Sequence, residues 1–271
     1  MADGEAQTPA THAWANTRRA ERLARLEALL QDTGSARLEE AARVLGVSSM
    51  TLRRDLARPG LPLALLGGHV VAAGRGSGGY ALEQAQDQHA AAKRQAAALA
   101  AQMVRDGDTL FVDCGTTTPH LVESLPAGPA LTVVCYALNI ATLLARRPNT
   151  RLVLLGGLYH PGATTFTSDE ALASLKRLRL NTAFLSAAGV DVAHGATSIN
   201  FNEVPVKQMA LASAGRAVLV VDGSKLGQLR PAWFAPLSAF ARVVTDASAP
   251  EAEQAALRRA GCALDVAPPA P

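Results

Sequence analysis

The chain has 271 residues, of which 49% are hydrophobic, and a formal net charge of +3 at neutral pH. This length suffices for one large domain or for a small and a medium one, and the apolar content suffices for a buried core. The small charge does not by itself indicate a nucleic-acid partner, so a basic surface would have to be local. No apolar run reaches the roughly 18 residues that a membrane helix requires, and the first residues lack the pattern of a signal peptide. We therefore expect a cytoplasmic protein without a membrane segment.

The three cysteines, Cys114, Cys135 and Cys262, are far apart in the sequence and form no pair at metal-ligand spacing. Free thiols in a reducing compartment explain this pattern better than a disulfide or a zinc site. We expect no metal site and no cofactor.

The N-terminal part of the chain predicts a small domain. Residues 1–16 are small and polar and are predicted to be a disordered tail. Leucines then recur at helical spacing, and a second helical stretch over 38–46 ends at a glycine. A third helix is predicted to begin after Ser48, whose hydroxyl suits the N-cap position. Two apolar runs around a glycine pair within 61–73 predict a hairpin. Three helices and a hairpin indicate a winged helix-turn-helix over residues 17–73.

The third helix of this domain would carry small hydroxyl residues and arginines in its first two turns. In such folds the N-terminal part of this helix meets base edges in the major groove. Arginine pairs with guanine or phosphate, and small hydroxyl side chains reach bases or phosphates. An ordinary helical bundle with a solvated basic face is the alternative interpretation. The candidate DNA-binding residues are Ser48, Ser49, Met50, Thr51, Arg53 and Arg54.

The rest of the chain predicts a larger domain of a different class. Residues 74–89 are rich in glycine and then in polar residues, and they are predicted to be a linker. Beyond them, apolar runs typical of strands, such as TLFV (109–112) and LTVVC (131–135), alternate with helical stretches. This alternation predicts an α/β domain over residues 90–266, with a parallel sheet covered by helices on both faces.

The stretch DCGTTTPH (113–120) follows one predicted strand and precedes a predicted helix. Ligands of parallel sheets bind beyond the carboxyl ends of the strands. Gly115 would let the backbone approach a ligand, and the hydroxyls of Thr116, Thr117 and Thr118 would hold a phosphate beside the backbone amides. A helix cap without a ligand is the alternative for any single threonine.

Polar residues also follow other predicted strands. Several strand ends converge at one edge of a parallel sheet, so we expect their side chains to share a pocket. Glu203 and Lys207 are four residues apart, and a surface ion pair is the alternative interpretation for these two. The pocket candidates from these positions are Asp113, Asn139, Gly156, Glu203 and Lys207.

Both halves of the chain resemble a known family. The run from Arg22 to SSMTLRRDL (48–56) resembles the helix-turn-helix signature of the DeoR family of bacterial transcriptional repressors. The resemblance implies that helix 48–58 reads an operator in double-stranded DNA and that 61–73 is the wing. The stretches VDCGTTTP, VCYALN and VVDGSKLGQLRPA resemble the effector domain of the same family, which is similar in turn to ribose-5-phosphate isomerase.

The resemblance further implies that a sugar phosphate is the inducer, with deoxyribose-5-phosphate expected. In such proteins the phosphate is held by a lysine before the first helix, by the GT-rich loop and by a lysine in a D-x-S-K run. Those lysines are Lys93 and Lys225 here, and the loop is Gly115 to Thr118. The residues matched to the sugar end are Glu203 and Lys207.

An isomerase-like enzyme is the alternative from another class. Most of the family and the isomerases carry a carboxylate in a G-A-D-G-type turn, where this sequence has Ala188. The loss of one acid beside an intact phosphate site indicates binding without turnover, so we expect no catalytic residues. A regulator of another sugar-phosphate pathway stays open. We also expect a homo-oligomer, because one winged helix rarely supplies enough contact area for an operator.

Overall fold

The computed structural model describes residues 19–26, 28–30, 35–56, 63–66, 69–72 and 89–269. The chain divides into two compact units, Met1–Ser77 and Gly78–Pro271. The predicted tail (1–16) and all but the last residue of the predicted linker (74–89) lie outside the described residues, so both stay predictions. No helix within the described ranges is long and apolar enough to cross a membrane.

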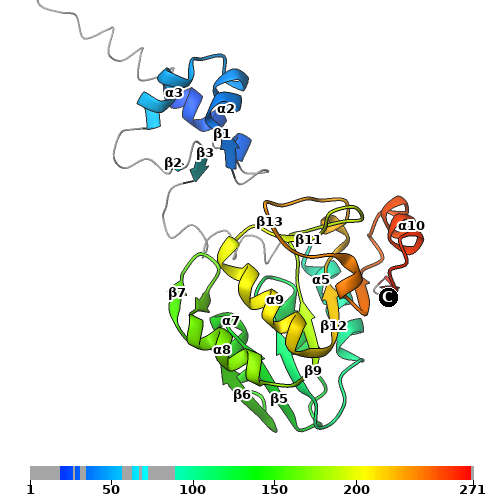
Figure 1. The fold of residues 1–271 in the computed structure, drawn as a ribbon. Helices are drawn as coiled ribbons and strands as arrows, with labels where there is room; N and C mark the ends of the chain where they lie inside the picture. The colour runs from blue at the N-terminus through cyan, green and yellow to red at the C-terminus, as the bar shows by residue number, and fades with distance from the viewer. Residues whose placement is uncertain are drawn as a thin grey trace, which may run out of the picture. The chain divides into compact units, whose positions relative to one another are not determined.

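The smaller unit combines helices with a small antiparallel sheet (Figure 1). The sheet has the strand order β1-β3-β2, and β2 and β3 form the predicted hairpin, with Leu66 opposite His69. Strand β1 was not predicted, because a three-residue strand shows no recognisable alternation; it pairs with β3. Residues 19–26 and 28–30 are helical, and the other elements are β1 (Ser35–Arg37), α2 (Leu38–Val44), α3 (Ser49–Leu56), β2 (Leu63–Leu66) and β3 (His69–Ala72).

Each helix contributes a fully buried leucine to the core of the smaller unit. Leu26, Leu38 and Leu52 are fully buried and belong to one hydrophobic cluster. The turn between α2 and α3 passes through Gly46 at φ +68°, a left-handed conformation that suits glycine. The hydroxyl of Ser48 accepts a hydrogen bond of 3.1 Å from the N–H of Thr51, which confirms the predicted N-cap. These contacts fix which face of α3 points outward.

The larger unit is built on a seven-stranded sheet with the order β15-β14-β12-β9-β4-β5-β6. All six strand pairs are parallel, which confirms the predicted sheet type. Along the chain the strands are added outward from β4 to β6, and then from β9 outward to β15. The strands are β4 (Thr109–Val112), β5 (Leu131–Cys135), β6 (Thr150–Leu154), β9 (Leu180–Leu185), β12 (Ala214–Val220), β14 (Arg242–Thr245) and β15 (Leu264–Val266).

Helices cover both faces of this sheet, with α8 and α9 in front and α5 behind in Figure 1. Helix α5 packs against α6, and α6 packs against α7, while α8 packs against α9. The helices are α5 (Ala90–Ala101), α6 (Thr118–Ser124), α7 (Leu138–Leu144), α8 (Asp169–Arg177), α9 (Val204–Ser213) and α10 (Glu251–Arg259), with the 3-10 turns η1 (Phe201–Glu203), η2 (Gly223–Lys225) and η3 (Leu237–Ala239).

Two small antiparallel sheets accompany the main one. Their strands are only three or four residues long, and the sequence did not predict them. They are β7 (Leu158–His160) with β8 (Thr165–Thr167), and β10 (Gly189–Asp191), β11 (Gly195–Ser198) and β13 (Ala232–Ala235) in the order β10-β11-β13.

Candidate functional site

In the main sheet, β5 and β6, which follow β4 in the chain, lie on one side of it, and β9 and the later strands of this sheet lie on the other side. The strand order therefore reverses between β4 and β9. In open α/β sheets, ligands bind beyond the carboxyl ends of the strands at such a switch point. Asp113 follows β4 and Ser186 follows β9. The N–H and the hydroxyl of Ser186 both donate to Oδ2 of Asp113, at 2.8 and 3.1 Å. A buried carboxylate therefore lies where the fold places ligands.

Lys207 of α9 reaches this carboxylate from the helix layer. Its Nζ donates to Oδ2 of Asp113 and, at 3.1 Å, to the carbonyl of Ser186. It lies 3.8 Å from Oε2 of Glu203, and only 1% of the Lys207 side chain is exposed. Burial by itself acts to lower the pKa of Lys207, but neighbouring negative charges, with that of Asp113 first, raise the pKa above its ordinary value. Lys207 is thus a buried, protonated cation.

Glu203 completes the network, with both carboxylate oxygens engaged. The hydroxyl of Ser198 donates to its Oε2 at 2.6 Å, and the amide of Asn200 donates to its Oε1 at 2.7 Å. The structure therefore brings together three predicted sugar-binding residues, Asp113, Glu203 and Lys207. It also buries all three, and Lys207 forms an ion pair with each of the two carboxylates, so their polar groups are satisfied inside the protein.

Tyr136 and Cys114 extend the network on the other side of the carboxylate. The Tyr136 hydroxyl donates to Oδ1 of Asp113 at 2.9 Å and lies 3.0 Å from the Cys114 sulfur. Burial raises the pKa of both groups, so both stay protonated and can act as donors. The sequence pattern did not single out Tyr136 or Ser186, although Ser186 stands at a strand end like the residues that were predicted.

The loop that follows Asp113 shows why glycine stands at position 115. Gly115 has φ +115°, and a Cβ added there would lie 2.9 Å from the Ser186 hydroxyl. The three threonines after it are not equivalent. Thr118 is fully buried and donates to the carbonyl of Cys114 at 3.1 Å, and Thr117 is 5% exposed. Thr116 lines a cavity, whose wall among the described residues does not include Thr117 or Thr118.

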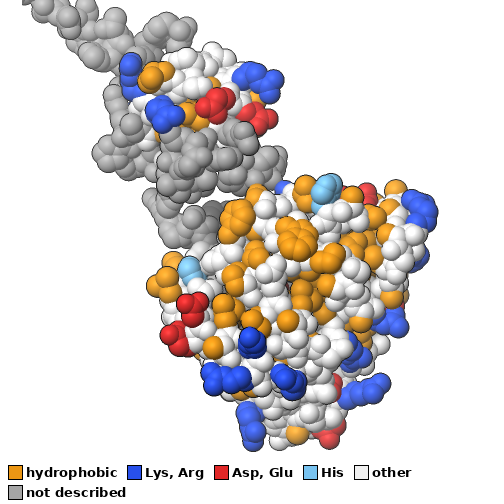
Figure 2. Space-filling model, in the orientation of Figure 1, with side chains coloured by type: hydrophobic (Ala, Val, Ile, Leu, Met, Phe, Trp, Pro, Cys, Tyr) orange, Lys and Arg blue, Asp and Glu red, His pale blue; other side chains and the backbone are white. Residues whose placement is uncertain are grey.

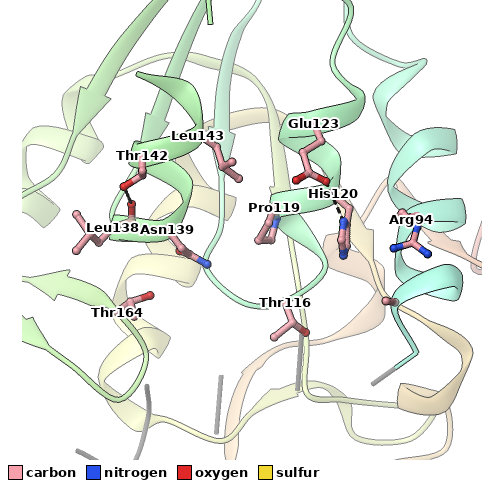
Figure 3. A pocket seen from close by; sticks show the side chains of 11 residues that line it. Arg94, Thr116, Pro119, His120, Glu123, Leu138, Asn139, Thr142, Leu143 and Thr164 are labelled. Atoms are coloured by element: carbon pink, nitrogen blue, oxygen red, sulfur yellow. Dashed lines mark hydrogen bonds and ion pairs between the residues drawn. The ribbon is translucent and has the colours of Figure 1, made fainter. Parts of the chain in front are cut away.

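This cavity has a volume of about 520 Å³ and lies between α5, α6 and α7 (Figure 3). Of the predicted residues, Thr116 and Asn139 line it. The Asn139 amide donates to the carbonyl of Gly115 at 3.2 Å, and its oxygen accepts from the N–H of Ile140 at 2.9 Å. Asn139 thus ties the GT-rich loop to the start of α7 and forms part of the cavity wall.

Several residues of the cavity wall were missed by sequence reasoning. Arg94 and His120 face each other across one side of the cavity in Figure 3, and Nδ1 of His120 lies 3.0 Å from Oε2 of Glu123. Thr164 lines the opposite side. Arg94 is adjacent to Lys93, which the sequence predicted as a phosphate-binding residue. The sequence did not show that Arg94, rather than Lys93, lies on the helix face that lines the cavity.

Three residues that the sequence predicted to bind the effector lie neither in the buried network around Asp113 nor in the wall of this cavity. Lys93 is 1% exposed within α5, Gly156 is exposed after β6, and Lys225 lies in η2 after β12. Their roles in holding an effector stay predictions. Within the described ranges, no group of three or more His, Cys, Asp or Glu side chains is placed to hold a metal ion.

In the smaller unit, the outer face of α3 carries two arginines and a methionine. Arg53 and Arg54 are exposed, and Met50 is 65% exposed. Asp55 points the other way: it accepts hydrogen bonds of 3.0 and 2.6 Å from Arg22, and its backbone carbonyl accepts one of 2.8 Å from Arg19. The candidate DNA-binding residues Ser48, Ser49, Met50, Thr51, Arg53 and Arg54 thus begin α3 on the side away from the core, except that Ser49 is half-buried.

Comparison with known proteins defines the class. The DeoR C-terminal sensor domain family matches residues 88–247, and the DeoR-like helix-turn-helix domain family matches residues 22–60. The chain belongs to the DeoR family: it is a helix-turn-helix transcriptional regulator with a sensor domain, and not an enzyme. The helix-turn-helix implies a DNA partner and the sensor domain a small-molecule effector.

Among individual relatives, the chain is 42% identical to the deoxyribose operon repressor of Escherichia coli K12, over 85% of this chain and 91% of the relative. It is 30% identical to the lactose phosphotransferase system repressor of Staphylococcus epidermidis, over 83% and 91%. It is 28% identical to the regulator IolR of Bacillus subtilis, over 83% and 90%. Among solved structures, ribose 5-phosphate isomerase A of Neisseria gonorrhoeae is 19% identical over 49% of this chain and 52% of that one, with a TM-score of 0.38.

Proposed function

We propose that the chain represses genes of deoxyribonucleoside catabolism and that deoxyribose-5-phosphate is its inducer. The observation that carries this proposal is the 42% identity to a deoxyribose operon repressor over 91% of that relative. The cavity beside the GT-rich loop supports it, because about 520 Å³ accommodates a five-carbon sugar phosphate and Arg94, Thr116 and Asn139 supply polar groups to its wall.

DNA binding in this proposal depends on α3. Its exposed arginines contact operator phosphates and base edges, and such binding weakens as salt rises because phosphate contacts release counterions. The inducer acts by binding more tightly to a form of the protein that binds DNA poorly. Only this difference in affinity can shift the population of the two forms.

The proposal includes a homo-oligomer, because a helix-turn-helix protein reads two half-sites with two heads. Figure 2 shows hydrophobic side chains gathered on one face of the larger unit. Near β11 and β13, Ile199, Phe201 and Trp233 are 58%, 68% and 51% exposed. Exposed apolar side chains of this size support self-association.

A different inducer is the alternative, since relatives in the same family carry names that refer to other systems, such as the lactose phosphotransferase system. Thermal unfolding of the full chain with deoxyribose-5-phosphate, ribose-5-phosphate, glucosamine-6-phosphate and fructose-1-phosphate separates the two. A ligand at ~100 times its dissociation constant adds about 2.7 kcal/mol to stability.

We expect deoxyribose-5-phosphate to raise the melting temperature most and to release the protein from a duplex selected out of a random-sequence pool. A larger shift with another sugar phosphate would replace the inducer and keep the regulator. A ligand that binds but leaves the DNA complex intact would contradict induction.

A further inference from the structure

The cavity between α5, α6 and α7 has two chemically different sides (Figure 3). Arg94 and Glu123 make one side charged, and His120 lies on the same side. Asn139 and Thr164 make the other side polar and neutral. Such a division suits a ligand that has an anionic group at one end and hydroxyl groups at the other.

On the charged side, Glu123 is engaged by His120, which lies 3.0 Å from it. Arg94 projects its guanidinium towards the same space and makes no interaction with the other residues drawn around the cavity (Figure 3). A guanidinium offers five donors in a fixed planar arrangement that matches a phosphate. The charged side can therefore bind a phosphate through Arg94 without breaking an existing contact in the cavity.

On the neutral side, Thr164 has an unusual conformation. Its φ is +53°, a left-handed value that is rare for a β-branched residue. Its carbonyl accepts a hydrogen bond of 2.7 Å from the N–H of Leu138, which holds the residue against the start of α7. Its Oγ1 is buried and has no hydrogen-bond partner among the residues that the structure describes. Backbone strain of this kind concentrates at ligand-binding sites, and an unpaired hydroxyl is a ready partner for a ligand hydroxyl.

We propose that this cavity holds the effector with its phosphate against Arg94 and a sugar hydroxyl against Thr164. This rests on the proposed function, because it takes a phosphorylated sugar as the effector. Pro119 and Leu143 lie between the two sides in Figure 3 and offer apolar surface to a sugar carbon that lacks a hydroxyl. The assignment adds two effector-binding residues that lie outside the GT-rich loop.

Isothermal titration of the full chain with deoxyribose-5-phosphate and with ribose-5-phosphate tests the proposal. We expect Arg94→Gln to weaken binding about tenfold or more, and Thr164→Val, which keeps the shape and branching, to weaken it about threefold to tenfold. Arg146→Gln is the control for charge, because Arg146 is exposed and does not line the cavity. Thr165→Val is the control for the hydroxyl, because its Oγ1 is also buried and without a hydrogen-bond partner in the described part of the chain, but Thr165 does not line the cavity.

Wild-type affinity in both Arg94→Gln and Thr164→Val would overturn the cavity assignment and leave the proposed function standing. Equal loss in Thr164→Val and Thr165→Val would also overturn it, because the loss would then follow hydroxyl removal in general. Absence of binding by the wild-type protein to both sugar phosphates would overturn the inducer and the cavity assignment together.

Discussion

Lys207 of α9 donates a hydrogen bond to Asp113 at the end of β4, although the two residues are 94 positions apart in the sequence. Both side chains are at most 1% exposed. The ion pair joins a helix on one face of the sheet to the switch point from which the GT-rich loop departs. It therefore sets the position of the loop on which one wall of the cavity depends.

Removing the cation of this pair should destabilise the larger unit. Lys207→Met leaves Asp113 as a buried carboxylate without its cation, which typically costs about 3–5 kcal/mol. We expect urea unfolding to show a loss of this size, and the double variant Asp113→Asn with Lys207→Met to recover part of it. Lys176→Met, on the exposed side of α8, is the matched control and should change stability by less than about 0.5 kcal/mol. Equal losses in the two lysine variants would contradict this role.

The same pair predicts how stability depends on pH. The pKa of Lys207 is raised in the folded state, so its ionisation stabilises the fold fully below the unfolded-state pKa of about 10.4. That contribution is lost as the pH rises through the higher folded-state pKa. The difference in unfolding free energy between the wild type and Lys207→Met should stay constant between about pH 7 and 9 and shrink above about pH 10.4. A difference that shrinks between pH 7 and 9 would disagree with this assignment.

Gly115→Ala should distort the GT-rich loop. The glycine has φ +115°, and the new Cβ would lie 2.9 Å from the Ser186 hydroxyl, which is already within hydrogen-bond distance (2.8 Å) of the Cys114 backbone carbonyl. We expect a loss of about 1–3 kcal/mol in unfolding free energy together with weaker effector binding in titration. Gly128→Ala is the control, because a Cβ there meets no described residue within 4 Å and its φ is not left-handed. Unchanged effector affinity in Gly115→Ala would show that the loop does not shape the site.

Neighbouring residues of α3 should separate DNA affinity from stability. Arg53→Ala and Arg54→Ala should weaken binding to a selected duplex and leave the melting temperature unchanged, because both side chains are exposed. Each lost phosphate contact should reduce the slope of log affinity against log salt by about 1. Asp55→Ala should instead lower stability by about 1–3 kcal/mol, because Asp55 pairs with Arg22 and Arg19. Fluorescence anisotropy at several salt concentrations and a melting curve measure the two effects. Arginine variants with wild-type affinity would exclude this face of α3.

The thiols should differ in reactivity. Cys114 and Cys135 are buried, and burial raises the pKa of Cys135 to about 12 and that of Cys114 well above its ordinary value. Cys262 is only partly buried. Because the thiolate is the nucleophile, we expect one thiol to react with a disulfide reagent in the native protein and two more after unfolding. Cys262→Ser should abolish the native reaction, and a persisting reaction would show that a buried thiol becomes exposed.

The sequence by itself determined the local elements of this protein. The runs TLFV and LTVVC form buried strands, Ser48 caps α3, and the two apolar runs of the predicted hairpin form paired strands. These predictions succeed because hydrophobic periodicity and turn chemistry act over a few neighbouring residues. The polar residues at strand ends could also be predicted from the local sequence, because they stand close to the ends of apolar runs.

Only the tertiary structure decided which of those residues meet. The order of strands in the sheet places β9 beside β4 and so brings Ser186 to Asp113, and the packing of α9 against β9 brings Lys207 there. A strand buried on both faces has a continuous apolar sequence, and that sequence does not indicate which strands lie beside it in the sheet. Packing likewise decided that Lys93 is buried in α5 while the adjacent Arg94 faces the cavity. Consecutive residues on a helix point in directions about 100° apart, so packing of the whole helix selects which of two neighbouring cations can reach a ligand.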